Sequence, residues 1–315
     1  MRMGKCLVIG GNGFLGSHVV DMLAAAGHQV TAFDRFSSGT QNYSAANVTP
    51  LVGDFLDRSH LSRAVADQDF VFHFLSITTP ASAESDPTLD IRTNLAQTVD
   101  LFEFCADAGV QRLFFASSGG AIYGASDRQA SAETDPTWPV SPYGIIKLAI
   151  ENYLGYFKAT RGLEHTIFRI SNPYGPRQGP TKTQGLIPVV LNRIARGLPI
   201  TRFGDGTMIR DFLFVDDLMR MVGMALSEDV PHDVYNLGHG EGHSVNDILE
   251  SVRRVTGHDF VVLERPSPPT FIQRSVLDVS RFNSDFGPLN YTKLDDGIRA
   301  TWDLLPTNFE TQSLR

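Results

Sequence analysis

The residues with the clearest capacity for chemistry are Tyr143 and Lys147, which stand four positions apart. On a helix this spacing puts both side chains on one face. A lysine ammonium beside a phenol stabilises the phenolate, so the pKa of the phenol should fall from about 10 toward neutral pH. A tyrosine in this state is a general base for a substrate hydroxyl. The alternative is a surface tyrosine beside a solvated lysine, and the surrounding sequence has to decide between the two.

A serine-rich segment offers a second hydroxyl for the same chemistry. Ser117 and Ser118 end an apolar run, and Ser118 lies 25 residues before Tyr143. If the run is a strand of a parallel sheet, these hydroxyls lie at the carboxyl edge of the sheet, where ligands bind. We expect Ser118 to be the catalytic hydroxyl, with Ser117 as the alternative.

A glycine-rich turn near the N-terminus predicts a dinucleotide site. Gly10, Gly13 and Gly16 follow a short apolar run and open a helical pattern. Glycine permits a tight turn and close approach of the backbone to a pyrophosphate, and the helix N-terminus supplies amide donors. Asp34 ends the next apolar run, where its carboxylate would accept hydrogen bonds from an adenosine ribose. A carboxylate there repels a 2′-phosphate and favours NAD over NADP, whereas Arg35 beside it could pair with that phosphate.

Two further points follow from a nicotinamide cofactor. The positive charge of the oxidised ring would add to the effect of Lys147 on the pKa of Tyr143. Asp54 has two interpretations: contact with the adenine edge, or an N-cap for the helix expected near Arg58.

These residues are positioned by an alternating pattern of strands and helices. Apolar runs alternate with amphipathic stretches and lie at residues 6–9, 30–33, 49–52, 70–74, 112–116 and 165–170. The rhythm predicts an α/β fold of Rossmann type, a doubly wound parallel sheet covered on both faces, over residues 1–172. Helical spacing and its start and stop signals predict helices over 14–26 and 89–108.

The pattern changes after about residue 172, where prolines interrupt shorter helices such as one expected over 186–196. We expect a smaller, mixed α/β lobe over 173–315 to bind the substrate, with late helices over 280–286 and 294–304. The chain is expected to return to the sheet around 211–240. The cleft between the two lobes is the expected ligand site.

Composition limits the partners. The 315 residues contain 27 Lys and Arg against 35 Asp and Glu, a net charge of −8, so a phosphate-bearing ligand must be held by local donors. This balance argues against nucleic acid and anionic membranes as partners. No apolar run approaches the roughly 18 residues of a spanning helix, and the first is too short for a signal peptide. We expect a cytoplasmic protein, and no histidine or cysteine spacing predicts a metal site.

The glycine turn, the segment from Ser117 to Tyr123-Gly124 and the Tyr143/Lys147 pair together resemble the extended short-chain dehydrogenase/reductase superfamily. Later motifs resemble its NAD-dependent epimerase/dehydratase family, and within it the UDP-glucose 4-epimerase branch. These motifs are Ser141-Pro142-Tyr143, Arg169-Ile170-Ser171-Asn172-Pro173-Tyr174-Gly175, Gly204-Asp205-Gly206, Arg210-Asp211-Phe212 and Val215-Asp216-Asp217. The resemblance covers nearly the whole chain.

The resemblance implies NAD as cofactor and UDP-sugars as substrates. Besides the residues already named, it assigns to the cofactor Phe14, Leu15, Arg35, Ser38, Gly39, Phe55, Leu75 and Ser117, together with Tyr143 and Lys147. On the substrate side it implies Asn172 at the sugar diphosphate, Leu186 offering backbone to the nucleotide, Phe203 stacking on uracil and Arg210 pairing with phosphate. The C-terminal phosphate and ribose clasp of the family is altered: Arg265 occupies that region, and Arg274 is a candidate substitute.

The implied reaction is a 4-epimerisation through a 4-keto sugar, in which Tyr143 takes the proton of the sugar 4-hydroxyl with help from Ser118. Related dehydratases carry an Asp-Glu pair after the catalytic hydroxyl, whereas this chain has Gly119-Gly120, which has no side chain to eliminate water. In the similar epimerases the residue three positions before the Asp of Val276-Leu277-Asp278 limits the size of the sugar pocket; here it is the small Ser275, so the resemblance implies a pocket that admits an N-acetyl group. The expected substrate is therefore a UDP-hexose or a UDP-N-acetylhexosamine, with a dTDP-sugar as a further candidate.

Two alternatives stay open at this point: an NAD(P)-dependent nucleotide-sugar reductase or dehydrogenase, and a non-enzymatic dinucleotide-sensing protein. The resemblance also implies a homodimer through the helix at 89–108 and the helix that carries Tyr143 and Lys147. Leu148, Ile150, Leu154 and Phe157 would serve either that helix bundle or the core.

Overall fold

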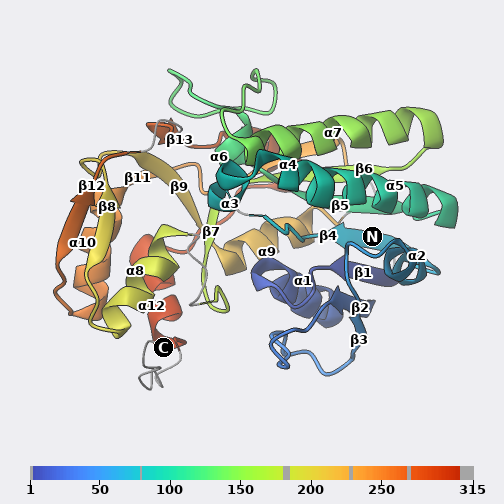
Figure 1. Ribbon diagram of the computed structural model, residues 1–315, viewed down its shortest axis with the longest axis horizontal. Helices are drawn as coiled ribbons and strands as arrows, with labels where there is room; N and C mark the ends of the chain where they lie inside the picture. The colour runs from blue at the N-terminus through green and yellow to red at the C-terminus, as the bar shows by residue number, and fades with distance from the viewer. Residues whose placement is uncertain (1–2, 79, 180–184, 227–229, 268–270, 306–315) are drawn as a thin grey trace.

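A computed structural model describes residues 3–78, 80–179, 185–226, 230–267 and 271–305. Its centre is a sheet of seven parallel strands in the spatial order β10-β6-β5-β4-β1-β2-β3 (Figure 1). The strands are β1 (Lys5–Ile9), β2 (Gln29–Asp34), β3 (Val48–Val52), β4 (Phe70–His73), β5 (Arg112–Ser118), β6 (His165–Ile170) and β10 (Val234–Leu237). The six strands predicted from the apolar runs are confirmed. The order reverses between β1 and β4, where open sheets of this kind bind their ligands.

Both faces of the sheet are buried, as a parallel sheet requires. On one face α1 (Phe14–Ala25) and α9 (Val215–Met224) cover the side chains of Cys6 and Val8. On the other face α2 (Arg58–Val65), α5 (Ala96–Ala108) and α7 (Pro142–Arg161) cover Leu7 and Ile9 (Figure 1). Successive residues of β1 thus point to opposite helix layers, as the period of two in a strand dictates.

The helix predicted over 89–108 is interrupted. It consists of α4 (Pro87–Asp90), a π-helical turn η1 (Ile91–Leu95) and α5. Asn94 lies in the turn, where its amide donates to Thr78 Oγ1 at 2.8 Å and also bonds Asp90. The predicted end at Gly109 is confirmed, since this residue has φ 70°, the left-handed conformation that favours glycine. Two short helices complete this half, α3 (Pro80–Ser85) and α6 (Gly119–Ile122).

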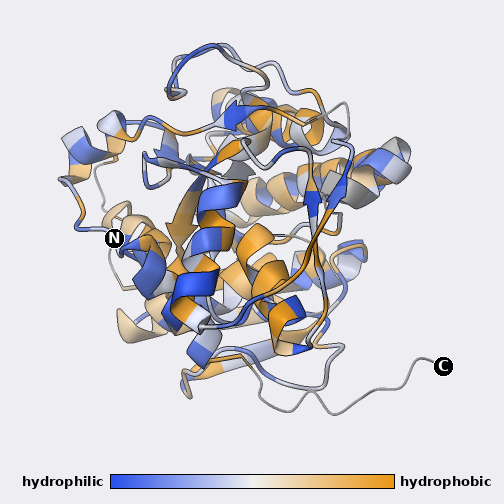
Figure 2. Ribbon diagram, turned by 90° about the vertical axis from the view of Figure 1, so that its left-hand side faces the viewer, coloured by the Kyte–Doolittle hydropathy of each residue, from blue (hydrophilic) through white to orange (hydrophobic). Residues whose placement is uncertain are grey.

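The second lobe is built from short strands and three helices around its own apolar cluster. Strands β7 (Asn172–Tyr174), β9 (Ile209–Phe214), β11 (Gly242–Ser244) and β13 (Arg274–Ser275) form one sheet, and β8 (Ile200–Phe203) pairs with β12 (Val262–Arg265). The helices are α8 (Leu186–Ala195), α10 (Val245–Thr256) and α12 (Leu294–Asp303). Figure 2 faces this lobe and shows helices that carry hydrophilic and hydrophobic residues on different sides.

The chain passes between the lobes more than once. From β9 it runs into α9, which packs on α1, and then into β10, the seventh strand of the central sheet. Helix α11 (Ser280–Phe286) packs against β10, and its Phe282 is fully buried in the same core as α1. Among the described helices, none combines the length and the apolar content needed to cross a membrane.

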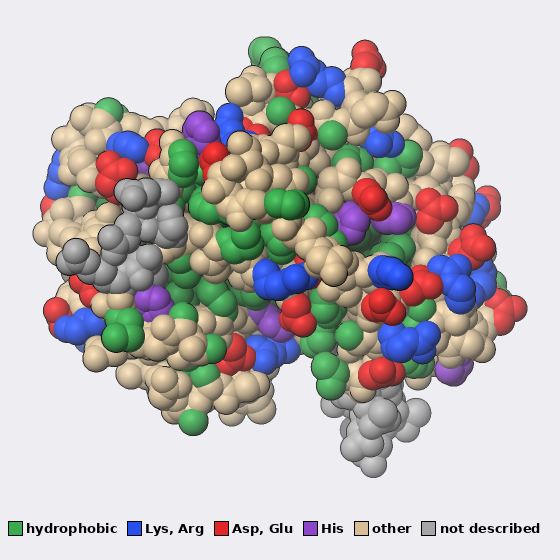
Figure 3. All heavy atoms as spheres, turned by 180° about the vertical axis from the view of Figure 1, so that it is seen from behind, with side chains coloured by type: hydrophobic (Ala, Val, Ile, Leu, Met, Phe, Trp, Pro, Cys, Tyr) green, Lys and Arg blue, Asp and Glu red, His purple; other side chains and the backbone are tan. Residues whose placement is uncertain are grey.

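The surface carries charges of both signs. Figure 3 shows the side of the molecule opposite to that of Figure 1, where acidic and basic side chains of the described residues lie interspersed over both lobes. Mixed charges of this kind largely cancel at a distance, so this face presents no large field of one sign. An anionic ligand therefore depends on donors within a site.

Candidate active site

Ser118, Tyr143 and Lys147 meet where β5 ends and α7 begins. Helix α7 starts after Ser141, whose side chain accepts the Gly144 N–H at 3.2 Å. A Cβ atom at Gly144 would lie 2.5 Å from Ala121 O, so glycine is what lets α7 approach α6 closely. The Tyr143 phenol is hydrogen-bonded to the side chain of Ser118, a contact that lowers the phenol pKa.

Lys147 is buried next to this pair. Its Nζ donates to Ala116 O at 2.8 Å and lies 5.7 Å from the centroid of the Tyr143 ring. The Ser117 hydroxyl, the alternative catalytic group, instead donates to Glu151 on α7 and is 5% exposed. Ser118 is therefore the serine that the fold brings to the tyrosine.

The pKa values of the pair differ from the prediction. Burial raises the pKa of Tyr143 to about 12, and the negative charge of Asp90 adds to this. Burial lowers the pKa of Lys147 to about 8, although Asp90 and Glu151 oppose the shift. Between about pH 8 and pH 12 both the phenol and the amine are therefore neutral, so the chain's own residues do not form a phenolate with an ammonium beside it. The predicted fall in the phenol pKa needs a further positive charge, such as that of an oxidised nicotinamide.

A small cavity beside Tyr143 and Lys147 brings in polar residues that the sequence did not single out. His73, Asp90, Asn94 and Thr98 line it. His73 is 2% exposed and burial lowers its pKa to about 3, so its ring stays neutral. Among the described residues, Asp90 Oδ2 is buried without a hydrogen-bond partner, and its carboxyl group lines the cavity together with Tyr143 and Lys147. A spacing rule could not find these residues, because η1, where Asn94 lies, breaks the helical register of this region.

The glycine turn has the form that a pyrophosphate site requires. Gly10 has φ 82°, and a Cβ atom at Gly16 would lie 2.0 Å from Gly10 O. Helix α1 begins after Gly13, which has no side chain to cap the helix, and its first turn carries no acidic residue. The N–H groups of Phe14 and Leu15 have no acceptor within the helix. These residues therefore fit the diphosphate of a dinucleotide.

The other predicted cofactor residues lie along the same carboxyl edge of the sheet. Asp34, at the end of β2, accepts the N–H of Asn12 at 3.1 Å and of Arg35 at 2.7 Å. Arg35 is exposed, and Ser38 and Gly39 follow in the adjoining turn. Leu75 follows β4, and a Cβ atom at Gly10 would lie 3.1 Å from it.

Asp54 and Phe55 follow β3. The interpretation of Asp54 as an N-cap is wrong, because Asp57 caps α2 by accepting from the N–H groups of Ser59 and His60. The Asp54 carboxylate accepts the Leu56 N–H at 3.0 Å, in the turn before the helix. Phe55 is buried and stacks on His73, so its side chain packs in the core. Contact with adenine stays the prediction for Asp54.

Four of the five predicted substrate residues line one pocket of about 350 Å³ in the second lobe. They are Asn172, Leu186, Phe203 and Arg210. Arg210 is half-buried, and its guanidinium donates to the carbonyl of Ile209 at 2.8 Å. No carboxylate among the described residues lines the pocket. A guanidinium in such surroundings is suited to an anionic ligand.

The fifth predicted residue, Arg265, lies outside this pocket. It ends β12, a strand that pairs with β8 but does not line the pocket, and its side chain is exposed. Arg274 is also elsewhere, since its Nε donates to Gln129 O at 2.8 Å. The sequence missed Arg202, whose Nε is buried without a partner, and Phe271, whose ring meets Phe203 at 5.9 Å and 72°.

Asn172 connects the pocket to the catalytic end of β5. It lines the pocket, and a Cβ atom at Gly120, two residues after Ser118, would lie 3.9 Å from its Nδ2. The same Cβ position lies 4.0 Å from Ser275 Oγ, whereas a Cβ at Gly119 would lie 2.6 Å from Leu277. The pocket that would hold the nucleotide of a ligand therefore adjoins the end of β5, where the reacting part of that ligand would lie.

The sheet is of Rossmann type, and one edge of it carries both the glycine turn and the Ser118, Tyr143 and Lys147 group. This combination defines a nicotinamide-dependent enzyme of the short-chain dehydrogenase/reductase type. The chain belongs to the NAD dependent epimerase/dehydratase family, whose model matches residues 6–238. It is thus an NAD-dependent enzyme.

Similar proteins extend over nearly the whole chain. A UDP-glucose 4-epimerase of Mycolicibacterium smegmatis is 30% identical over 94% of this chain and 97% of its own. The solved UDP-glucose 4-epimerase of Thermus thermophilus in complex with NAD has a TM-score of 0.89, 33% identity, and covers 95% of this chain and 98% of its own. The UDP-glucose 4-epimerase of Thermotoga maritima with UDP-glucose has a TM-score of 0.88 and 32% identity, with the same two shares. These likenesses confirm the predicted fold and family.

Proposed function

We propose that the protein is a UDP-sugar 4-epimerase that works through a 4-keto sugar. The observation that carries this proposal is Asn172, which lines the anion-binding pocket and also faces Gly120 at the end of the catalytic strand. A nucleotide diphosphate held by Arg210 and Phe203 would place its sugar next to Ser118 and Tyr143.

The chain's residues have distinct roles in the proposed reaction. NAD, held by the glycine turn and Asp34, would supply the acceptor and donor for the hydride at C4 of the sugar. The Tyr143 phenolate takes the proton of the 4-hydroxyl, and Ser118 hydrogen-bonds the same oxygen. Lys147 stabilises the phenolate by its charge. After the ketone has turned over in the pocket, Tyr143 returns the proton to the new 4-hydroxyl.

The pocket beside Ser118 favours epimerisation over loss of water. Gly119 and Gly120 supply no acid or base, and Leu277 occupies the space where a side chain at residue 119 would begin. Water elimination from the keto sugar needs such a group to abstract and deliver protons. The keto sugar can then only be reduced again.

The test is to incubate the purified protein with UDP-glucose or UDP-galactose, without added cofactor, and to separate the products. We expect interconversion with no net change in the absorbance of reduced nicotinamide. Tyr143→Phe should lower kcat by about 10²- to 10⁴-fold, the usual contribution of a general base. Tyr153→Phe, on the exposed side of α7, is the matched control. Stoichiometric consumption of reduced nicotinamide would instead identify a reductase.

The sugar is the finer part of the proposal. Ser275 has a small side chain and lies near Gly120, which has none, so neither residue carries a bulky group at this border of the sugar site. We therefore propose that UDP-N-acetylhexosamines are accepted beside UDP-hexoses. The ratio of kcat/KM for UDP-N-acetylglucosamine and UDP-glucose checks this, and a strong preference for the unacetylated sugar would count against it.

A homodimer in the cytoplasm completes the proposal. Ile150, Leu154 and Phe157 are buried in the core of one chain, so they are not available for a helix bundle. The outer side of α7 carries Tyr153 and Tyr156, which are 41% and 57% exposed. We propose that this side pairs with a second copy. Light scattering should give twice the mass of 34.6 kDa, and Tyr156→Glu should shift it toward the monomer.

A further inference from the structure

A buried polar network joins the catalytic elements to the segment that borders the sugar. It begins at Glu151, one turn after Lys147 on α7. Arg169 on β6 donates from Nη2 to Glu151 Oε2 at 2.7 Å and from Nη1 to the Tyr123 hydroxyl at 3.0 Å. The Tyr123 hydroxyl in turn donates to Asn236 Oδ1 at 2.7 Å. These contacts lie in the interior, where such bonds are strongest.

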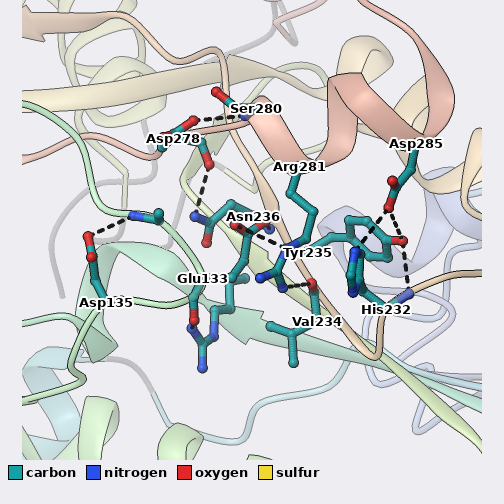
Figure 4. A network of polar contacts seen from close by, with 12 residues as sticks. Glu133, Asp135, His232, Val234, Tyr235, Asn236, Asp278, Ser280, Arg281 and Asp285 are labelled. Atoms are coloured by element: carbon teal, nitrogen blue, oxygen red, sulfur yellow. Dashed lines mark hydrogen bonds and ion pairs between the residues drawn. The ribbon is translucent and has the colours of Figure 1, made fainter.

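Asn236 is the point at which this network reaches the second lobe. It lies on β10 and is fully buried. Its Nδ2 donates to Ser131 O at 2.8 Å. The same Nδ2 donates to Asp278 O at 3.0 Å, and the backbone N–H donates to Glu133 Oε1 at 2.8 Å (Figure 4). The side chain thus uses both amide hydrogens and its oxygen, and any substitution leaves buried groups without partners.

The two carbonyls, of Ser131 and Asp278, belong to two backbone segments that are hydrogen-bonded to each other. Ser131 donates its N–H to Val276 O and accepts the Asp278 N–H, both at 2.9 Å. Residues 276–278 directly follow Ser275, and the side chain of Leu277 fills the space beside Gly119. This segment is the wall that faces the residues after the catalytic Ser118. We call residues 275–278 the sugar wall.

We propose that Asn236 is a positioning residue that fixes the sugar wall relative to Ser118 and Tyr143. The proposal rests on the proposed epimerase function. In that reaction the ketone has to turn over within the pocket while the nucleotide half stays bound. A displaced wall should slow the chemistry, and it should let the keto sugar leave before the hydride is returned to it. Nucleotide binding should not change, since neither Asn236 nor Tyr123 lines the nucleotide pocket.

Tyr123→Phe and Tyr235→Phe make a matched pair for the test. Each removes one hydroxyl that donates a 2.7 Å hydrogen bond, which is buried for Tyr123 and partly buried for Tyr235. Tyr235 neighbours Asn236 on β10 and is fully buried, but its hydroxyl donates to Asp285 Oδ2, away from the sugar wall (Figure 4). A merely structural loss should affect both variants alike.

Four quantities are to be measured for the wild type, Tyr123→Phe, Tyr235→Phe and Asn236→Ala: kcat, the absorbance of reduced nicotinamide during turnover, Tm, and the Kd values of UDP and UDP-glucose. We expect kcat to fall about tenfold for Tyr123→Phe and about 10²-fold for Asn236→Ala, the scale of a misplaced reacting group. In both variants reduced nicotinamide should accumulate, because each escaped keto sugar leaves its hydride behind. Tyr235→Phe should lower Tm with kcat unchanged.

The proposal would be overturned if the two phenylalanine variants had equal kcat and accumulated no reduced nicotinamide. It would also be overturned if the affinity for UDP fell by the same factor as kcat. If Asn236→Ala does not fold, the comparison of Tyr123→Phe with Tyr235→Phe still tests the positioning role. If the wild type interconverts no UDP-sugar, the epimerase function has failed separately. The Kd values still decide the positioning role in that case: Tyr123→Phe should weaken UDP-glucose relative to UDP, and an unchanged ratio would refute it.

Discussion

Replacing Lys147 by methionine would test the proposal that Tyr143 acts as a base with the help of the Lys147 charge. In the chain alone the pKa of Tyr143 is raised to about 12 and that of Lys147 is lowered to about 8. The active phenolate therefore depends on every positive charge that remains near it. Methionine keeps an unbranched apolar side chain and removes the charge, with its hydrogen bond to Ala116 O and its contact with the Phe115 ring.

The size of the effect follows from the geometry. The Lys147 nitrogen lies 5.7 Å from the centre of the Tyr143 ring. At an effective dielectric constant of about 20, two unit charges at that distance attract by about 3 kcal/mol. That energy equals a shift of about two pKa units, or about 10²-fold in the phenolate fraction at a fixed pH. Lys147→Met should therefore lower kcat by about 10²-fold at pH 7.

The assay is the pH dependence of kcat for UDP-glucose epimerisation. The acidic limb of the profile, which reports deprotonation of Tyr143, should move upward by about two pH units in Lys147→Met. Lys158→Met is the control, since Lys158 is on the same helix but binds Asp233 at 2.7 Å, away from the site. A variant at residue 147 that keeps kcat within about threefold and the same acidic limb would refute the reasoning.

Three further outcomes are expected. Because the pKa of Lys147 is lowered from 10.5 to about 8 in the folded chain, the unfolded chain binds more protons between about pH 8 and 10. The free energy of unfolding should then rise across that window in the wild type relative to Lys147→Met, as measured by urea denaturation. Gly16→Ala puts a Cβ atom 2.0 Å from Gly10 O and should weaken NAD binding at least tenfold in a fluorescence titration, whereas unchanged affinity would contradict the assigned turn. Arg210→Met should raise the Kd of UDP, measured by calorimetry, by roughly tenfold or more, as expected for loss of a charge-assisted hydrogen bond. The kcat of this variant, measured in rate assays, should stay within twofold of the wild type. A selective loss of kcat would place Arg210 beside the reacting atoms instead.

The strands and the glycine turn were predictable because their signals are local. Buried parallel strands need short apolar runs, and β6, with every residue buried, shows such a run. The turn needs glycine where the backbone of Gly10 is left-handed and where Gly16 approaches Gly10 O. The pairing of Tyr143 with Lys147 depends only on helical periodicity.

Other features depend on contacts between distant segments, which a local pattern does not contain. At the break η1, Asn94 bonds Asp90 nearby and also Thr78, which lies 16 positions earlier in the chain. Arg265 aligned with a phosphate clasp by order along the chain, yet the pairing of β12 with β8 leaves it outside the pocket.

The sequence by itself determined the parallel sheet and predicted the dinucleotide turn and the pairing of Tyr143 with Lys147, because each follows from residue type and spacing along one element. Only the tertiary structure decided that Ser118 and not Ser117 reaches Tyr143. It also decided that burial raises the pKa of Tyr143 and lowers that of Lys147, shifts that both favour the neutral side chain. Burial is the physical reason, because desolvation and Coulomb interactions depend on which groups the fold brings together. Asp90 acts on both residues although it lies more than 50 positions before them in the chain.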